Sequence, residues 1–293
     1  MKNFTIIFTL IFLVTFGFSQ NDINNKDLSP IKLTFDSKGA ELHGVYYPGN
    51  LNEPTPTIIL LHGYPGGRKG TLGLGDKLMK AGINALFFNS RGVYESEGIF
   101  TVGNYLQDVT AAANFLHSTV MTDSFGVDTT NLSILAYSFS GSIAFIGSIY
   151  NPSLKNVIAV EGGDFGHIAR EFQTDEETLK AYKRTFSKTM SDSGQVKGLG
   201  PDVLANEIIQ MEKQLDLVLN AEQLANKNIL LIGGWKDEGT LENHILPLFR
   251  ALQKHKAKNV EIEMFNDGHR FKNVRDELAD KIIEWIKINT INN

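Results

Sequence analysis

The sequence contains no cysteine among its 293 residues. This absence excludes disulfide bonds, thiolate metal sites, iron–sulfur clusters and a cysteine nucleophile. It also excludes the lipid anchor of bacterial lipoproteins, which is attached to a cysteine. Only 8 prolines are present, so long proline-rich linkers and a collagen-like repeat are excluded as well.

Charged residues are few and nearly balanced in sign. Lys and Arg total 28, Asp and Glu total 33, and the formal net charge is −5. Such a chain lacks the basic excess that binding to a phosphate backbone requires, so we expect no nucleic-acid partner. Hydrophobic residues make up 42% and charged residues 21%, as in soluble globular proteins. The length fits one large domain or two small ones.

Residues 1–19 have the pattern of a secretory signal peptide. Lys2 precedes the run Phe4–Phe18, which is apolar apart from its threonines and one glycine. As a helix this run spans about 22 Å, less than the roughly 30 Å of a bilayer core. Small residues precede a cleavage point near Ser19. We therefore expect a secreted or periplasmic protein, with mature chain 20–293 and no stable membrane insertion after cleavage. A single amino-terminal membrane anchor is the alternative.

The mature chain alternates short apolar runs with helical patterns. Apolar runs of this length are typical of parallel strands buried on both faces, and a turn between the first two segments predicts a hairpin. The alternation predicts an α/β domain with helices on both faces of the sheet. The expected strands are 31–35, 42–47, 57–61, 83–88, 132–136, 157–160, 229–232 and 261–265, and the expected helices are 70–81, 104–119, 139–150, 241–256 and 274–289.

Residues 164–226 interrupt this alternation. They contain two long amphipathic helical patterns, near 174–190 and 202–224, with a polar loop at 191–194 between them. About sixty residues between two buried strands exceed an ordinary crossover connection. The stretch therefore predicts a helical insertion, here named the cap. In the alternative interpretation, one of these helices is the regular crossover and the rest is decoration.

Ser138 lies where the apolar strand 132–136 runs into a helical pattern. This strand–serine–helix context is that of a nucleophile elbow, in which the serine occupies a strained turn and its neighbours two positions away must be small. Ala136 and Ser140 are small, although glycine is usual at both places, and Gly141 adds room. The alternative is an ordinary serine at the start of a helix.

A second strand end carries a histidine followed by glycines, at His62–Gly67. Backbone N–H groups in such a loop are able to point at a developing oxyanion. We expect the amides of Tyr64 and Phe139 to form the oxyanion hole, and we interpret His62 as a structural residue. The glycines complete neither a phosphate loop nor a dinucleotide fingerprint.

Two further strand ends carry an acid and a histidine. Asp237 follows the strand at 229–232, and His269 lies in a glycine-flanked loop after the last strand. A histidine is suited to act as general base, and a carboxylate would orient its ring and stabilise the imidazolium. Ser138, Asp237 and His269 occur in the order serine, acid, histidine. The segment from Glu161 to Asp164 also ends a strand and offers an alternative acid.

Together these segments resemble the α/β-hydrolase family over essentially the whole mature region. The matching pieces are His62–Gly66, the turn at Ser138, Trp235–Glu238 and Asp267–His269. The loop Phe88–Gly98 also resembles the R-G-x-G-x-S-x-G loop of feruloyl or cinnamoyl esterases, dienelactone-hydrolase-like proteins and serine-aminopeptidase-like hydrolases, with a tyrosine at one glycine position. The resemblance implies an eight-stranded, mostly parallel sheet whose second strand is antiparallel, helices on both faces, and a helical cap after the sixth strand.

The function that follows is a serine hydrolase acting on carboxylic esters through an acyl-enzyme on Ser138. This chemistry requires no cofactor and no metal, and its partner is a small-molecule ester or peptide. Two alternatives stay open at this point. One is an aminopeptidase-like hydrolase of amide bonds, and the other is a non-catalytic binding protein on the same fold. The acyl and alcohol groups and the oligomeric state are not specified by the sequence.

Overall fold

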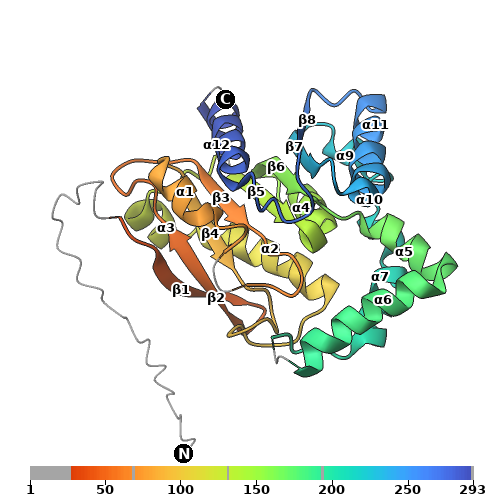
Figure 1. Ribbon diagram of the computed structural model, residues 1–293. Helices are drawn as coiled ribbons and strands as arrows, with labels where there is room; N and C mark the ends of the chain where they lie inside the picture. Colours follow the sequence, from red (N-terminus) through yellow and green to blue (C-terminus); the bar gives the residue numbers. More distant parts are fainter. Residues whose placement is uncertain (1–27, 68–69, 131, 193–194, 292–293) are drawn as a thin grey trace, which may run out of the picture.

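The computed structural model describes residues 28–67, 70–130, 132–192 and 195–291. Its eight strands form one sheet in the order β1-β2-β4-β3-β5-β6-β7-β8 (Figure 1). The sequence therefore predicted the sheet correctly. The strands are β1 (Ile31–Ser37), β2 (Ala40–Tyr47), β3 (Thr57–Leu60), β4 (Asn84–Phe88), β5 (Leu132–Tyr137), β6 (Leu154–Val160), β7 (Asn228–Gly234) and β8 (Asn259–Phe265).

The antiparallel part of the sheet is confined to one edge. Strand β2 pairs antiparallel with both β1 and β4. Between β1 and β2, Lys38 and Gly39 have φ of 56° and 83°. Two successive residues with positive φ are typical of the tight turns that close hairpins, and glycine adopts this conformation without strain. The hairpin predicted from the turn residues is confirmed.

From β3 to β8 all pairings are parallel. Every residue of β3 and β4 is buried, which explains why these strands are largely apolar in sequence. Because the strands run in one direction, their carboxyl ends meet at one edge of the sheet. The loops that follow β3, β5, β6, β7 and β8 are thereby brought together.

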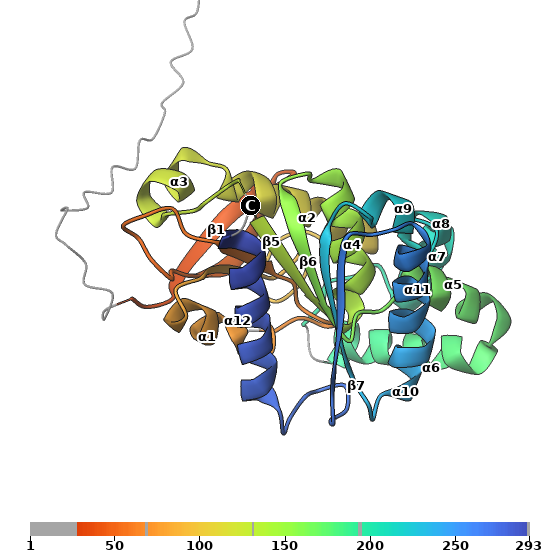
Figure 2. The same cartoon turned by 90° about the horizontal axis from the view of Figure 1, so that it is seen from above.

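Helices cover both faces of the sheet, as Figure 2 shows from above. Helices α1 (Leu74–Lys80) and α12 (Arg275–Ile291) pack on one face, where Leu78, Ile282 and Trp285 join the buried cluster. Helices α2 (Val102–Leu116), α4 (Gly141–Tyr150) and α11 (Leu246–Lys254) contribute to the cluster on the other face. A short helix, α3 (Thr119–Phe125), follows α2 and was not predicted separately. These layers confirm the predicted α/β architecture.

Helices of the cap lie between β6 and β7 and project to one side of the sheet (Figure 1). The sequence predicted helices near 174–190 and 202–224. The first corresponds to a continuous helical segment that is displaced by two residues, whereas the second is divided into three short helices. The observed elements are α5 (Phe165–Thr174), α6 (Glu176–Ser187), the π-helix η2 (Lys188–Asp192), α7 (Pro201–Gln210), α8 (Glu212–Leu215) and α9 (Ala221–Leu224).

Two aspartates account for the breaks in these helices. The side chain of Asp175 accepts hydrogen bonds from the backbone N–H groups of Glu177 and Thr178, so it starts α6 and separates it from α5. Asp216 is 2% exposed and accepts from the N–H of Leu219. Short polar side chains that bind nearby backbone groups compete with helix continuation, which periodicity alone does not reveal.

The middle of the cap, between η2 and α7, is joined to the loop that follows β4. The N–H of Lys197 donates to the carbonyl of Gly92 at 2.7 Å, and the N–H of Phe100 donates to the carbonyl of Lys197 at 2.8 Å. The carboxylate of Glu207 on α7 accepts from the N–H groups of Val102 and Gly103, at the start of α2. These hydrogen bonds fasten the cap to the body of the protein.

The predicted signal peptide 1–19 lies outside the described residues. Within the described ranges, none of the helices has both the length and the apolar character needed to cross a bilayer.

Candidate active site

Ser138 begins a short 3-10 helix, η1 (Ser138–Ser140), directly after β5. Its φ is 56°, a left-handed conformation that is unusual for a residue with a side chain. Strain of this kind is concentrated at functional sites, because the surrounding structure must hold it in place. The turn predicted around Ser138 thus has the strained backbone that a nucleophile elbow requires.

The structure explains the unusual serine two positions later. The hydroxyl of Ser140 folds back, accepting from the N–H of Tyr137 at 3.0 Å and donating to the carbonyl of Tyr137 at 3.1 Å. It therefore fits the tight turn without entering the site. At Gly141 an added Cβ would lie 2.5 Å from the backbone of Gly163, so this close approach does require glycine.

The structure brings Ser138, His269 and Asp237 together from the ends of three strands. The Nε2 atom of His269 lies 2.8 Å from Oγ of Ser138. Its Nδ1 atom lies 2.6 Å from Oδ2 of Asp237. With Nδ1 protonated and donating to the carboxylate, Nε2 is left to accept the serine proton. This is the hydrogen-bonded chain that nucleophile, base and orienting acid need.

Asp237 is held as an anion by its neighbours. Burial opposes its ionisation, but hydrogen bonds from His269 and Thr240 outweigh this and hold the pKa of Asp237 below its usual range. The Thr240 hydroxyl donates to Oδ2 of Asp237 at 3.0 Å. Asp237 is thus fixed in orientation by a residue that the sequence analysis did not single out.

Tyr137 anchors the loop that carries His269. Its hydroxyl donates to the backbone carbonyl of His269 at 3.1 Å, and the two rings lie 5.6 Å apart between centroids. Tyr137, which directly precedes Ser138, thereby fixes the loop that carries His269. A strand residue with this role carries no sequence signal, because an inward-facing tyrosine reads as part of the core.

Ser138 and His269 open into a cavity of about 340 Å³. Tyr64 and Phe139, whose amides were predicted to form the oxyanion hole, both line it, and their ring centroids are 5.3 Å apart. Helix α6 of the cap closes the far side. The lining residues are Tyr64, Ser138, Phe139, Glu161, Gly163, Phe165, Ile168, Ala181, Tyr182, Thr185, Phe186, Thr240, His244 and His269.

Comparisons with solved structures identify the fold. Est1E from Butyrivibrio proteoclasticus, solved with ferulic acid, superposes with a TM-score of 0.66 at 16% identity, over 89% of this chain and 100% of that one. An esterase of Pyrococcus furiosus superposes with a TM-score of 0.62 at 18% identity, over 92% and 95%. This chain has the α/β-hydrolase fold.

A further α/β-hydrolase-fold neighbour is a peptidase. The acylaminoacyl peptidase of Pyrococcus horikoshii superposes with a TM-score of 0.65 at 19% identity. The match covers 91% of this chain and 42% of the peptidase. No protein-family model matches the sequence, and no curated protein does so either.

His62 and Asp164, which also lie near strand ends, do not take part in the hydrogen bonds that join Ser138, His269 and Asp237. His62 is 3% exposed and stacks on Tyr105, and burial lowers the pKa of His62 to about 4. Asp164 is buried at the start of α5, where it accepts from the N–H groups of Gly166 and Leu217. Burial and the nearby charge of Asp216 raise the pKa of Asp164 to about 6. The structural interpretation of His62 therefore fits its surroundings.

His244 lines the cavity, although it falls within the helix that the sequence predicts at 241–256 and was not singled out as a site residue. It lies in the π-helix η3 (Leu241–Ile245), and its ring packs edge-on against His167 with centroids 5.3 Å apart. Burial lowers the pKa of His244 to about 4, so the ring is neutral. The extra residue of a π-helix shifts the side chains that follow, and no simple period predicts this.

Nitrogen and oxygen atoms suited to a metal do gather at the site. One ligand atom each from Glu161, Asp237 and His269 lies within 4.8 Å of the others. A cation here would compete with the hydrogen bonds that join His269 to Asp237 and Ser138. These side chains are therefore better matched to proton transfer than to metal binding.

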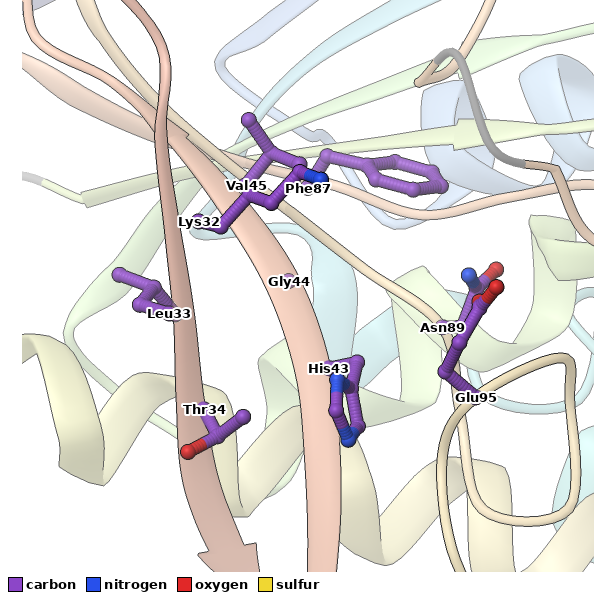
Figure 3. Close-up of a pocket in the computed structure, with 9 residues that line it drawn as sticks. All are labelled: Lys32, Leu33, Thr34, His43, Gly44, Val45, Phe87, Asn89 and Glu95. Carbon is purple, nitrogen blue, oxygen red and sulfur yellow. The ribbon is translucent and has the colours of Figure 1, made fainter.

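A second hollow lies on the sheet face formed by β1, β2 and β4 (Figure 3). Its volume is about 460 Å³, and its walls include Lys32, Thr34, His43 and Asn89. None of the residues of the Ser138 chain lines it. The two hollows are thus separate, and the strained serine marks the first as the candidate active site.

Proposed function

We propose that this protein is a serine hydrolase that cleaves carboxylic esters through an acyl-enzyme on Ser138. The observation that carries the proposal is the continuous hydrogen-bonded chain from Ser138 through His269 to Asp237, which begins at a serine in a strained turn. The chain lies at the wall of a cavity whose other walls are largely aromatic and aliphatic. Such a cavity suits a small, mainly apolar ester.

In the proposed first half-reaction, Oγ of Ser138 attacks the acyl carbon while Nε2 of His269 takes the serine proton. The carbonyl oxygen becomes an oxyanion, and the amides of Tyr64 and Phe139 donate to it. The tetrahedral intermediate collapses, the ester C–O bond breaks, and His269 passes the proton to the leaving alcohol.

In the second half-reaction, water attacks the acyl-enzyme. His269 takes a proton from the water, the intermediate collapses, and Ser138 regains a proton as the carboxylic acid leaves. Asp237 orients the ring and stabilises the imidazolium in both halves. No cofactor enters either step.

Labelling with a fluorophosphonate probe tests the proposal, because only an activated serine reacts. We expect the wild-type protein to be labelled and to turn over chromogenic esters. Ser138→Ala should abolish labelling and lower turnover by about 10⁶-fold, as in other serine enzymes that lose the nucleophile. Ser142→Ala is the matched control, because Ser142 lies in α4 and its hydroxyl donates to the backbone carbonyl of Leu215 in α8.

Two outcomes would replace this proposal. Faster turnover of aminoacyl-anilides than of esters would identify an amide hydrolase, an option motivated by the fold shared with an acylaminoacyl peptidase. Absence of both labelling and turnover would identify a non-catalytic binding protein.

We further propose that residues 1–19 direct export and are then removed. Cell fractionation should therefore find the protein outside the cytoplasm, and its mass should lack this segment.

A further inference from the structure

Glu161 is a buried carboxyl group that the proposed reaction does not use. It follows β6 directly, is 1% exposed, and has a φ of 48°. Like Ser138, it therefore holds a backbone conformation that is costly for a residue with a side chain. A strained, buried acid at a strand end next to the site calls for a physical explanation.

The backbone and side chain of Glu161 join the ends of β6 and β7. Its N–H donates to the carbonyl of Ile232 at 2.8 Å, and its Oε1 accepts from the N–H of Gly234 at 2.7 Å. A Cβ at Gly234 would lie 3.0 Å from this oxygen and 2.4 Å from the carbonyl oxygen of Asp267, so glycine is needed there. Gly234 opens the loop that carries Asp237, and Glu161 thus helps to place that loop.

The other oxygen of Glu161 points to a role beyond this contact. Among the described residues, Oε2 has no hydrogen-bond partner although it is buried. Glu161 lines the cavity together with Ser138 and His269. One of its oxygens also belongs to the group of atoms from Glu161, Asp237 and His269 that lie within 4.8 Å of one another.

The two neighbouring carboxyl groups divide the charge between them. Burial, followed by the charge of Asp237, raises the pKa of Glu161 to about 8, against the opposing effect of the Gly234 N–H. The pKa of Asp237 is lowered instead. Near neutral pH, Asp237 is therefore the anion and Glu161 the neutral acid, as expected for two acids that share a site.

The charged and titratable groups near Glu161 come from several elements. Asp237 lies after β7 and His269 after β8, while Tyr137 ends β5 and has a raised pKa to which Glu161 contributes. His244 of η3 shares the cavity and is neutral, since burial lowers its pKa to about 4. None of these groups offers Glu161 a fixed positive charge.

We propose that Glu161 is a positioning residue that acts on His269 through the Asp237 loop and through its own charge. As a neutral acid it fixes the start of that loop and leaves Asp237 as the single anion beside the imidazole. As an anion it adds a second negative charge next to the imidazolium that forms in the transition state, which stabilises that state. This inference rests on the proposed serine hydrolase reaction and adds an alkaline activation to it.

Glu161→Gln separates the two parts of this role. The amide keeps the shape of the side chain and an oxygen that accepts from Gly234, but it does not ionise. Glu207→Gln is a matched control, because Glu207 also accepts from backbone N–H groups and does not line the cavity. Glu161→Asp restores an ionisable group and tests rescue.

The measurement is the rate of inactivation by a fluorophosphonate probe between pH 6 and pH 10. In the wild type and in Glu207→Gln we expect this rate to rise roughly threefold to tenfold around pH 8, because ionised Glu161 adds a second negative charge beside the imidazolium that forms in the transition state. Glu161→Gln should react at neutral pH but lack the rise, and Glu161→Asp should regain part of it. A rise that persists in Glu161→Gln, or a flat wild-type profile, would overturn the inference.

A measurement on the wild-type protein does not depend on any variant folding. With glutamate labelled with ¹³C at the carboxyl carbon, one resonance should titrate near pH 8. If every glutamate titrates below about pH 6, Glu161 is not the neutral acid described here. Failure of the proposed function is distinguishable, because it would abolish probe labelling at every pH while leaving this titration in place.

Discussion

Two strand ends of this molecule carry a histidine in a glycine-flanked loop, and their surroundings differ. His62, after β3, is 3% exposed, and its ring nitrogens bind the carbonyl of Gly63 and the backbone and hydroxyl of Ser90. His269, after β8, has a side chain that is 40% exposed and binds Ser138 and Asp237. His62 and His269 therefore share a residue type and a position at a strand end. They differ in their hydrogen-bond partners and in their access to solvent, and only His269 is hydrogen-bonded to the strained serine.

The largest expected effect separates these histidines by activity. His269→Ala should lower kcat/KM by about 10⁶-fold, since the serine loses its base, and Asp237→Asn should lower it by about 10⁴-fold. Because the His269 side chain is partly exposed, the melting temperature should change by only a few degrees. Ester turnover and thermal unfolding measure the two effects.

The double variant Ser138→Ala, His269→Ala sharpens this test. Residues that act as one unit are not additive, so the double variant should be no slower than Ser138→Ala alone. Losses that multiply would mean that His269 acts separately from Ser138, and they would contradict the proposed chain.

The second effect separates the histidines by stability. His62→Ala leaves a cavity beside Tyr105 and unpaired polar groups at Gly63 and Ser90, so the free energy of unfolding should fall by about 2–4 kcal/mol. Turnover per folded molecule should stay within about tenfold of wild type, which urea unfolding combined with active-site titration would measure. If His62→Ala folds but is as inactive as His269→Ala, the interpretation of His62 as a structural residue is contradicted.

The loss in His62→Ala should also depend on pH. The pKa of buried His62 is lowered from 6.5 to about 4. Between these values the unfolded chain binds a proton that the folded protein does not, so the stability due to the neutral ring is complete above pH 6.5 and is lost as pH falls toward 4. The advantage of wild type over His62→Ala should shrink by about 3 kcal/mol across this window. Wild type and His62→Ala must be compared with each other at every pH. The raised pKa values of Glu161 and Asp164 make the folded state more stable as pH falls, which is opposite to the effect of His62.

The smallest effect concerns the contact between the β3 loop and the cap. The hydroxyl groups of Tyr64 and Thr189 lie 2.5 Å apart, and the Tyr64 ring packs on Phe186. Tyr64→Phe removes this hydrogen bond but keeps the ring and the backbone amide. We expect a stability loss of about 1 kcal/mol and a decrease in kcat/KM of about fivefold or less. A much larger loss of activity would show that the phenolic hydroxyl itself contacts the substrate.

The sheet could be predicted because its burial leaves a direct trace in the sequence. Strands such as β3 and β4 are buried at every residue, so they appear as short, largely apolar runs between turn residues. The order of Ser138, Asp237 and His269 then placed their side chains at one edge, since parallel strands end together. In this part of the chain, the direction and order of the strands thus determine where these side chains lie.

The cap and the surroundings of the site were less predictable. Asp175 and Asp216 end helices through local hydrogen bonds, which a helical period does not reveal. His244 reaches the cavity through a π-helix, and Glu161 becomes important only because Gly234 of the neighbouring strand lies beside it. These features depend on contacts between segments far apart in the chain, so propensity and spacing do not encode them.

The fastening of the cap has a consequence for selectivity. Backbone hydrogen bonds join Lys197 to Gly92 and Phe100, and Glu207 binds the first N–H groups of α2. Helix α6, which carries Tyr182 and Phe186 into the cavity wall, is thus followed by two segments that are hydrogen-bonded to the body of the protein. Exchanging these two side chains would change the shape of the cavity without altering the elements that carry Ser138, Asp237 and His269.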